Sequence, residues 1–299
     1  MRKFLFKLSI FVGLIFLLNR EVAALLQRGL DRYYGLDKGA WVLCIGHSHT
    51  MLGIDGVKLE RGLGVPVAKY AINGANTFDR LAMIRHYFAV RPDTVQLVVY
   101  DVDDHAFTGA GLGENSYQLL YPYLESPDID NYVRKNAGSW KEYIARRLLR
   151  LRRYNSVTLN LALRGVLHRY DNFKAGLVDV QALRKEIRTG RRPPITIDRE
   201  MVTAFAETVH FVRSHHARLV LFAIPTVDLV NDMNRERHEQ VMEIFKRYAE
   251  QDGGVIFLDY NPLFSQHHEL FCDPIHLNRD GQRQVTDRAI QDLGRLVKN

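Results

Sequence analysis

The sequence predicts an α/β fold with a doubly wound parallel sheet, a helical insertion and an N-terminal membrane anchor or signal. Three observations predict this class. Solid apolar runs of strand length recur along the chain, segments of helical periodicity separate them, and an uninterrupted apolar stretch occupies the N-terminus. Strands that are apolar on both faces and connected through helices are typical of a parallel sheet covered on both sides.

The first element expected is a signal-anchor at residues 1–25. Three basic residues precede or interrupt an apolar run at Leu8–Leu18, a pattern typical of a secretory signal or a short membrane anchor. The charged pair Arg20 and Glu21 makes a poor cleavage region, which favours an uncleaved anchor over a removed signal. A buried amphipathic helix is disfavoured because no polar residue alternates within Ile10–Leu18. By the positive-inside rule the rest of the chain then lies outside the cytoplasm, which argues against a nucleic-acid partner.

The sheet and its helices follow from residue 40 onward. Five strands are expected as short apolar runs: Trp41–Ile45, Val65–Ile72, Thr94–Val102, Arg218–Ile224 and Val255–Asp259. Four long helices are expected between and after them: Phe78–Val90, Arg199–His215, Arg235–Gln251 and Asp280–Val297. In such a fold, ligands and chemistry are found at the carboxyl ends of the strands.

Residues 105–197 are expected to interrupt the 40–299 domain as a basic helical insertion. From Arg134 to Arg192 there are 16 Lys and Arg residues against four acidic ones, so the rest of the chain is net acidic although the whole protein carries +7. Three apolar residues recur at helical spacing among the arginines: Ile144, Leu148 and Leu151. This pattern predicts either a helix lying on an anionic membrane or a helix packed on the domain, with equal support.

Three tyrosines open the same insertion, at Tyr117, Tyr121 and Tyr123. Aromatic rings can stack on sugar rings, but a tyrosine cluster is more often a packing feature at a domain edge. The tyrosines therefore do not identify a ligand by themselves.

The first candidate for chemistry is a serine in the turn after the first strand. Trp41–Ile45 leads directly into Gly46-His-Ser48-His-Thr, and a helix is expected next. A small-residue turn at a strand's carboxyl end exposes a hydroxyl beside free backbone N–H groups, which a nucleophile and its oxyanion donors require. Serine in such a turn is also a common helix N-cap, so Ser48 alone does not indicate catalysis.

The second candidate lies just before the last helix, in the segment Asp273-Pro-Ile-His276-Leu-Asn. An aspartate and a histidine three residues apart on a tight turn can point into one cleft. The carboxylate would then fix the imidazole tautomer, while the other ring nitrogen takes the proton of the serine. Taken alone, the pair could equally be a capping arrangement or half of a metal site.

The third candidate is the turn Asn73-Gly74-Ala-Asn76, where the second strand ends. Gly74 offers an unhindered backbone N–H, and Asn73 or Asn76 can add a side-chain donor, as in an oxyanion hole. Asn and Gly also suit ordinary turns. The three candidates together predict serine chemistry that needs no cofactor and no metal.

The order of these segments resembles the SGNH/GDSL hydrolase superfamily. Gly46-His-Ser48-His is similar to its first block, Gly74 to the glycine of its second block, and Asp273-Pro-Ile-His276-Leu-Asn to its last block. The last block is the most specific, and the likeness excludes the insertion. It implies a flavodoxin-like SGNH hydrolase fold, a triad of Ser48, His276 and Asp273, and oxyanion donors from the amides of Ser48 and Gly74.

Two positions depart from the family pattern. His47 stands where the family usually has Asp, and the third block, Gly-x-Asn-Asp, is absent because the third strand ends in Tyr100-Asp-Val-Asp-Asp104. The usual Asn oxyanion donor is therefore missing, which leaves Asn73 or Asn76 as a substitute.

These departures, with the N-terminal segment and the insertion, are more similar to the envelope branch of the superfamily. Its members resemble the D-alanine transfer proteins of teichoic acid and the acetyltransferases of exopolysaccharide export. The resemblance implies an acyl esterase or O-acyltransferase acting on an acylated glycan or similar envelope polymer, often with a membrane-bound acyltransferase partner. It places the protein at the inner or cytoplasmic membrane, with its catalytic domain facing the periplasm or the cell exterior.

Two other interpretations fit parts of the sequence. His47 and His49 flank Ser48, and Asp101, Asp103, Asp104 and His105 follow a nearby strand, so these side chains could bind zinc or a dinuclear centre. That interpretation leaves the turn of Asp273 and His276 unexplained. A catalytically degenerate scaffold of a membrane-bound polysaccharide-modification complex is the other interpretation, because the third-block Asn is lost.

Overall fold

The computed structural model describes residues 1–109, 115–190 and 194–298, and it divides the chain into two compact units. The anchor unit consists of Met1–Asp37 and Tyr117–Tyr170, and the sheet unit of Lys38–Ser116 and Asp171–Asn299. The segment expected as one insertion at 105–197 is thus divided between the two units.

A five-stranded parallel sheet forms the centre of the sheet unit. Its strands are β1 (Val42–Gly46), β2 (Val67–Ala71), β3 (Leu97–Asp101), β4 (Arg218–Ala223) and β5 (Val255–Asp259). Their order in the sheet is β2-β1-β3-β4-β5, and every neighbouring pair is parallel. This is the order of a flavodoxin-like doubly wound sheet, so the predicted fold class is confirmed.

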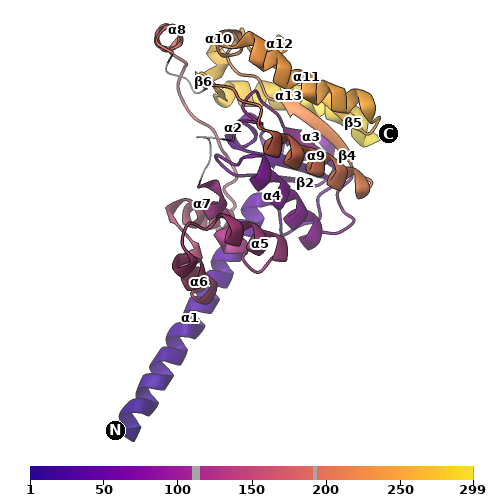
Figure 1. The fold of residues 1–299 in the computed structure, drawn as a ribbon. Helices are drawn as coiled ribbons and strands as arrows, with labels where there is room; N and C mark the ends of the chain where they lie inside the picture. The colour runs from indigo at the N-terminus through magenta and orange to yellow at the C-terminus, as the bar shows by residue number, and fades with distance from the viewer. Residues whose placement is uncertain (110–114, 191–193, 299) are drawn as a thin grey trace. The chain divides into compact units, whose positions relative to one another are not determined.

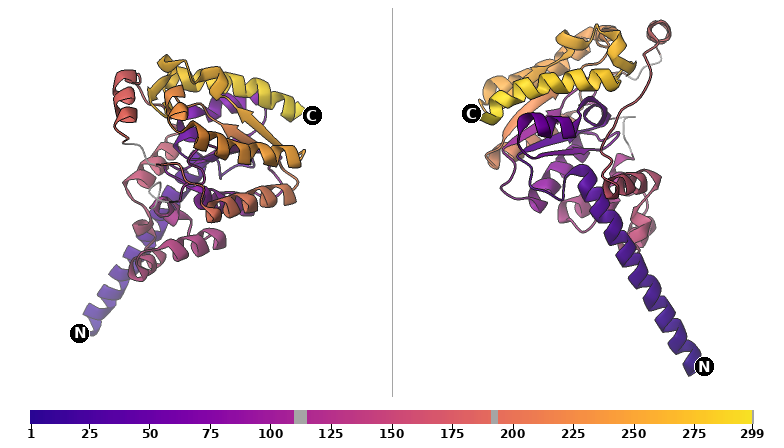
Figure 2. Two further views of the ribbon diagram at one scale, coloured as in Figure 1. Left: turned by 45° about the horizontal axis from the view of Figure 1, so that its top comes forward. Right: turned by 180° about the vertical axis from the view of Figure 1, so that it is seen from behind.

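Helices cover both faces of this sheet. One face carries α4 (Thr77–Val90), α9 (Arg199–Ser214) and α11 (Arg235–Gln251), and the other carries α3 (Gly56–Leu63) and α13 (Arg279–Lys298). Figure 2 shows α13, in yellow, on the side of the sheet opposite to α9 and α11. All five strands and the four long helices predicted from the sequence are confirmed, with bounds that differ by up to three residues.

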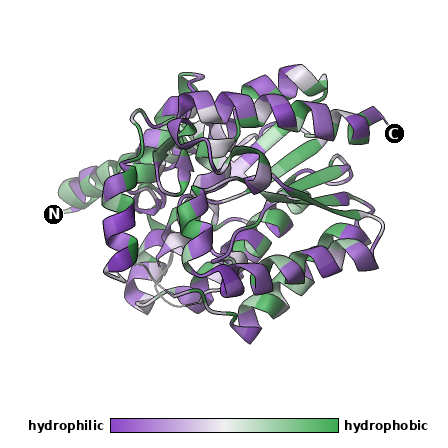
Figure 3. Ribbon diagram, turned by 90° about the horizontal axis from the view of Figure 1, so that it is seen from above, coloured by the Kyte–Doolittle hydropathy of each residue, from purple (hydrophilic) through white to green (hydrophobic). Residues whose placement is uncertain are grey.

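The strands are apolar on both faces because each face meets helices. In β1, Val42 and Cys44 pack into the core under α3 and α13, while the alternate residues Leu43 and Ile45 are fully buried on the other face. Figure 3 shows the strands as predominantly hydrophobic and the helices as mixed. A strand buried on both faces explains the continuous apolar runs of the sequence.

Short elements complete the carboxyl side of the sheet unit. They are α2 (Ser48–Gly53), α8 (Val180–Arg188), α10 (Asp228–Met233), α12 (Asn261–Phe264), the 3-10 turn η3 (His268–Leu270), and the antiparallel strands β6 (Phe271–Asp273) and β7 (His276–Leu277). The sequence periodicity indicated only α2 among them, because segments of two to nine residues carry little periodic signal.

The anchor unit is helical. It contains α1 (Arg2–Tyr34), the end of η1 (Ser116–Tyr123), α5 (Pro127–Asn136), α6 (Trp140–Leu148), η2 (Arg150–Arg153) and α7 (Ser156–Val166). Figure 1 shows α1, in indigo, as one continuous helix. The helix is long enough and apolar enough to cross a membrane, and its apolar side chains from Phe4 to Leu18 are exposed. The helix is compatible with the expected membrane anchor or signal.

The basic amphipathic helix expected through Ile144, Leu148 and Leu151 is interrupted. Helix α6 ends at Leu148, Leu149 adopts an extended conformation, and Leu151 lies in η2. The arginines of this segment form ion pairs with acidic residues of the same unit: Arg146 and Arg152 with Glu142, Arg147 with Asp130, and Arg150 and Arg153 with Glu125. Arg191 and Arg192, at the end of the basic stretch, lie outside the described residues.

The tyrosines of the insertion serve packing. Tyr121 and Tyr123 are buried, Tyr117 lies with its ring 6.2 Å from that of Tyr121, and the Arg146 guanidinium lies over the Tyr121 ring. A buried ring cannot stack on a sugar, so the packing interpretation is favoured.

Candidate active site

The structure brings the serine after β1 and the turn before α13 together. The Ser48 hydroxyl lies 2.8 Å from Nε2 of His276. On the other side of the ring, Nδ1 of His276 lies 2.9 Å from both carboxylate oxygens of Asp273. The side chains therefore form one hydrogen-bonded chain in the order Asp273, His276, Ser48, which is the arrangement of a serine nucleophile, its general base and the group that orients the base.

The turn that carries Asp273 and His276 is held by its own hydrogen bonds. The backbone N–H groups of Ile275 and His276 both donate to Oδ1 of Asp273, at 3.1 and 3.0 Å. Asn278 then caps α13, because its Oδ1 accepts the N–H groups of Asp280 and Gly281. The turn between β6 and β7 is thus fixed from both ends, which accounts for the spacing of aspartate, histidine and asparagine in the sequence.

The carboxylate of Asp273 is kept ionised by its surroundings. Partial burial would raise its pKa, but hydrogen bonds from His276 and the Ile275 amide and the positive charge of Lys174 outweigh this and hold the pKa well below its usual range. Lys174 Nζ lies 3.3 Å from Oδ2 of Asp273. An ionised Asp273 requires the proton on Nδ1 of His276, so that Nε2 is free to accept a proton from Ser48.

The turn at Ser48 requires the glycine that precedes it. A Cβ atom at Gly46 would lie 1.9 Å from the hydroxyl oxygen of Thr50 and 2.6 Å from Cβ of Asp101, so no larger residue fits. Ser48 is the first residue of α2, and His47 caps this helix by accepting the N–H of His49 at its Nδ1, at 3.2 Å. The serine is therefore presented at a strand-to-helix junction, with the N-terminal N–H groups of α2 beside it.

Two backbone amides beside the serine are available to an anion. Ser48 and Gly74 line one pocket, and neither N–H has a hydrogen-bond partner among the residues that the structure describes. Gly74 has a φ of 74°, which favours glycine. The two predicted side-chain donors differ in placement: Asn73 is exposed and is not among the pocket-lining residues, whereas Asn76 lines the pocket and caps α4 by accepting the N–H of Asp79.

His47 and Asp103 contact each other; they lie in the two segments where the sequence departs from the SGNH-like pattern. Nε2 of His47 lies 2.6 Å from Oδ2 of Asp103, and Nδ1 of His47 lies 3.4 Å from the Ser48 hydroxyl. Burial would lower the pKa of His47, but the carboxylates of Asp101 and Asp103 outweigh it and raise that pKa. Burial likewise would raise the pKa of Asp103, but His47 holds it far below its usual range. The metal-site interpretation already placed these two residues near each other, but their hydrogen bond was not predicted, because 56 residues separate them.

Three more buried polar side chains surround this pair. The ring of His49 lies between those of His47 and His276, 4.5 and 5.5 Å from them, and burial followed by the charge of His47 lowers the pKa of His49 to about 4. Asp101 accepts the N–H of Thr50 at its Oδ2. Arg80 is fully buried and directs its guanidinium to the backbone oxygens of Asp101 and Asn76 and to the Thr77 hydroxyl.

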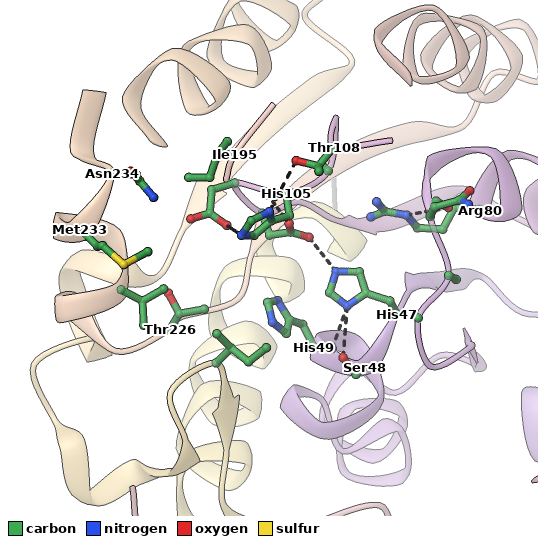
Figure 4. Close-up of a pocket in the computed structure, with 18 of the residues that line it drawn as sticks. His47, Ser48, His49, Arg80, His105, Thr108, Ile195, Thr226, Met233 and Asn234 are labelled. Carbon is green, nitrogen blue, oxygen red and sulfur yellow. Dashed lines mark hydrogen bonds and ion pairs between the residues drawn. The ribbon is translucent and has the colours of Figure 1, made fainter. Parts of the chain in front are cut away.

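His47, Ser48, His49, Arg80 and Asp103 are among the residues that line a cavity of about 330 Å³ at the carboxyl ends of β1–β4 (Figure 4). The lining is polar around Ser48 and includes four apolar side chains: Ile195, Val230, Met233 and Ile275. Figure 4 shows His47 and Ser48 next to each other on one side, with Met233 and Asn234 on the other. The apolar residues were not predicted, because they come from segments far apart in the sequence.

The comparisons with known proteins find only distant structural similarity. No protein-family model matches the chain, and no curated protein matches it. Among solved structures, the chain is similar to a GDSL-like lipase from Bacteroides thetaiotaomicron, with 12% identity over 84% of this chain and 88% of that one and a TM-score of 0.39. It is also similar to an acetylxylan esterase from Geobacillus stearothermophilus, with 13% identity over 86% and 95% and a TM-score of 0.43.

Proposed function

We propose that the protein is a serine acyl esterase or O-acyltransferase that acts through an acyl-serine intermediate. The observation that carries the proposal is the continuous hydrogen-bonded chain from Asp273 through His276 to the Ser48 hydroxyl. If Ser48, or the turn of Asp273 and His276, only capped a helix, the Ser48 hydroxyl would have no reason to contact His276. Their contact, beside a cavity that Ser48 lines, is what nucleophilic catalysis requires.

The geometry suits each step of acyl transfer. The Ser48 oxygen attacks the carbonyl carbon of an ester while its proton passes to Nε2 of His276. The amides of Ser48 and Gly74 would donate to the resulting oxyanion. His276 then returns the proton to the leaving oxygen, and the acyl group stays on Ser48. Water or a sugar hydroxyl, activated by the same His276 nitrogen, would take the acyl group from the enzyme and restore the free serine.

The substrate that we propose is an acylated glycan or a similar envelope polymer. The cavity has room for an acyl group and the sugar that bears it, and its four apolar side chains offer a wall for the acyl part. Hydrolysis and transfer differ only in the acceptor, so a site of this kind serves either reaction according to how well it excludes water.

The location that we propose is the inner or cytoplasmic membrane, with the sheet unit outside the cytoplasm. The exposed apolar surface of α1 from Phe4 to Leu18 supports this proposal, as do the basic residues at its start. A membrane-bound acyltransferase is the proposed partner if the reaction is transfer. Cell fractionation of the full chain and of a variant lacking residues 2–18 tests the anchor: the full chain should sediment with membranes and the variant should not.

An intact-mass experiment tests the chemistry. The full chain, purified in detergent, is incubated with p-nitrophenyl acetate and quenched in acid. The proposal predicts a mass increase of one acetyl group that maps to Ser48 and is lost in Ser48→Ala. Adding an oligosaccharide acceptor distinguishes transfer from hydrolysis, since transfer moves the acetyl group to the sugar. Acetylation that persists in Ser48→Ala would contradict the proposal.

A further inference from the structure

Four side chains behind Ser48 form a cluster that acyl transfer by the triad does not use. They are His47, His49, Asp101 and Asp103, and each offers a nitrogen or oxygen atom within 4.8 Å of the others. His49 and Asp101 are buried, and His47 and Asp103 are mostly buried. They are supplied by the turn after β1 and by the end of β3, which are adjacent strands whose carboxyl ends meet at one edge of the sheet.

Two atoms of this cluster are buried without a partner. Nδ1 of His49 and Oδ1 of Asp101 have no hydrogen bond within the described part of the chain. A buried polar atom left without a partner destabilises the folded state. Two unpartnered atoms in one cluster indicate that the cluster binds a further group with which both atoms interact.

The charge of the cluster favours a cation as that group. Among the described residues that line the cavity, Arg80 is the only arginine or lysine. Its guanidinium donates to the backbone oxygens of Asn76 and Asp101 and to the Thr77 hydroxyl. When His47 and His49 are neutral, as metal-binding imidazoles are, Asp101 and Asp103 against Arg80 leave one net negative charge in the cluster. Buried charges are compensated by ion pairing or by metal coordination.

We propose that His47, His49, Asp101 and Asp103 form a zinc site next to the nucleophile. Two imidazole nitrogens and two carboxylate oxygens are a donor set that zinc accepts in proteins. Zinc–ligand distances of about 2.0–2.2 Å bring donors closer together than 4.8 Å, so the side chains close around the ion by rotation. On binding zinc, His47 would exchange its hydrogen bond to Asp103 for a bond to the metal. When no metal is bound, a proton on His47 would supply the positive charge instead.

The position of the site gives the metal a chemical role. His47, His49 and Asp103 line the same cavity as Ser48, so a zinc ion held by them faces the substrate space. A cation there polarises a substrate oxygen and stabilises negative charge that develops on it. The side-chain oxyanion donor expected from the family pattern is absent from this chain, and the metal would supply the missing stabilisation. Metal binding itself does not depend on the proposed acyl transfer.

Metal content measures the site directly. The full chain is purified in detergent, stripped with a chelator, incubated with zinc chloride, desalted and analysed by mass spectrometry of the metal. The proposal predicts one zinc ion per chain in the wild type, and a melting temperature that zinc raises. Asp101→Asn and His49→Gln should bind zinc at least about 100-fold more weakly. Absence of stoichiometric zinc from the wild type would overturn the proposal, whatever the variants do.

Three variants separate this site from the triad. Asp104→Asn is the matched control, because Asp104 lines the same cavity but lies outside the four-residue cluster, and it should retain one zinc ion per chain. Ser48→Ala and His276→Ala should retain zinc while losing acylation. Zinc that is lost in His276→Ala and retained in Asp101→Asn would place the metal on the turn of Asp273 and His276, and would overturn the proposal.

Discussion

The hydroxyl of Ser48 and Nε2 of His276 lie 2.8 Å apart although 228 residues separate them in the sequence. Ser48 follows β1, which lies inside the sheet and ends at the same edge as its neighbours. His276 lies just before α13, which packs against the elements that follow β1, so the two side chains meet. Both turns are fixed locally, one by Gly46 and the other by Asp273 and Asn278. The contact is therefore set by the fold and does not depend on a bound substrate.

Replacing the nucleophile should remove turnover and leave stability almost unchanged. Ser48→Ala deletes one partly exposed hydroxyl and no packing group, so the melting temperature should stay within about 2 °C. Turnover of an acetyl ester should fall at least about 10³-fold, since the remaining site only binds and polarises the ester. Esterase assay and thermal denaturation of the same preparation check this. A large loss of stability with little loss of activity would indicate a structural serine.

Replacing the orienting carboxylate should reduce kcat without displacing the turn. Asp273→Asn keeps the shape but removes the charge that fixes the His276 tautomer, so kcat should fall by about 10³- to 10⁴-fold. Lys174→Met is the matched control: Lys174 also contacts Asp273, but the lysine is half exposed, so the loss should stay within about threefold. Equal losses in the two variants would contradict the assigned role of Asp273.

Adding one methyl group at Gly46 should disturb both the fold and the site. Its Cβ would collide with Thr50 and Asp101, so Gly46→Ala should lower the free energy of unfolding by about 3 kcal/mol. Gly253→Ala is the control, because its Cβ meets nothing within 4 Å. Urea denaturation of the two variants measures the difference. Equal stability would mean that the turn after β1 is looser than described.

The buried histidine His86 should make stability depend on pH. Burial lowers the pKa of His86 to about 4, while an unfolded chain has a histidine pKa of about 6.5. Between these values the unfolded state binds more protons, so stability falls as the pH falls. The expected contribution is about 3 kcal/mol between pH 7 and pH 4.

The control for this prediction is His86→Gln, which does not titrate and keeps a polar side chain near the Tyr70 hydroxyl, which lies 3.1 Å from Nδ1 of His86. Denaturation at pH 7 and at pH 4 should show a smaller loss of unfolding free energy in the variant than in the wild type. An identical loss in both proteins would show that His86 is not the group responsible.

The sheet and the apolar N-terminal helix were predictable from the sequence, whereas the division of the helical insertion into separate short helices was not. Strands buried on both faces appear as solid apolar runs, and apolar residues recur at helical spacing in long helices such as α11. Both patterns can be recognised in a single sequence. The expected amphipathic helix failed at Leu149, where the chain leaves the helical conformation and arginines pair with Glu125, Asp130 and Glu142. Those pairings depend on tertiary structure, which periodicity does not record.

The candidate site was predictable where one short segment carries the signal. Ser48 and the pair of Asp273 and His276 each lie in a turn with distinctive residues, and the structure brings them together. The contact of His47 with Asp103 required knowing that β1 and β3 are neighbours. Asn73 was chosen by residue type alone, and its exposed position shows why a suitable side chain near a turn does not define a donor.

Reaction of the full chain with a fluorophosphonate probe tests directly whether His276 activates Ser48 as a nucleophile. The probe phosphonylates a serine only when a neighbouring base activates it. We predict that the wild type is labelled at Ser48 and that Ser48→Ala is not labelled. His276→Ala should be labelled at least about 100-fold more slowly than the wild type. A wild type that remains unlabelled, or a His276→Ala variant labelled as fast as the wild type, would contradict this prediction.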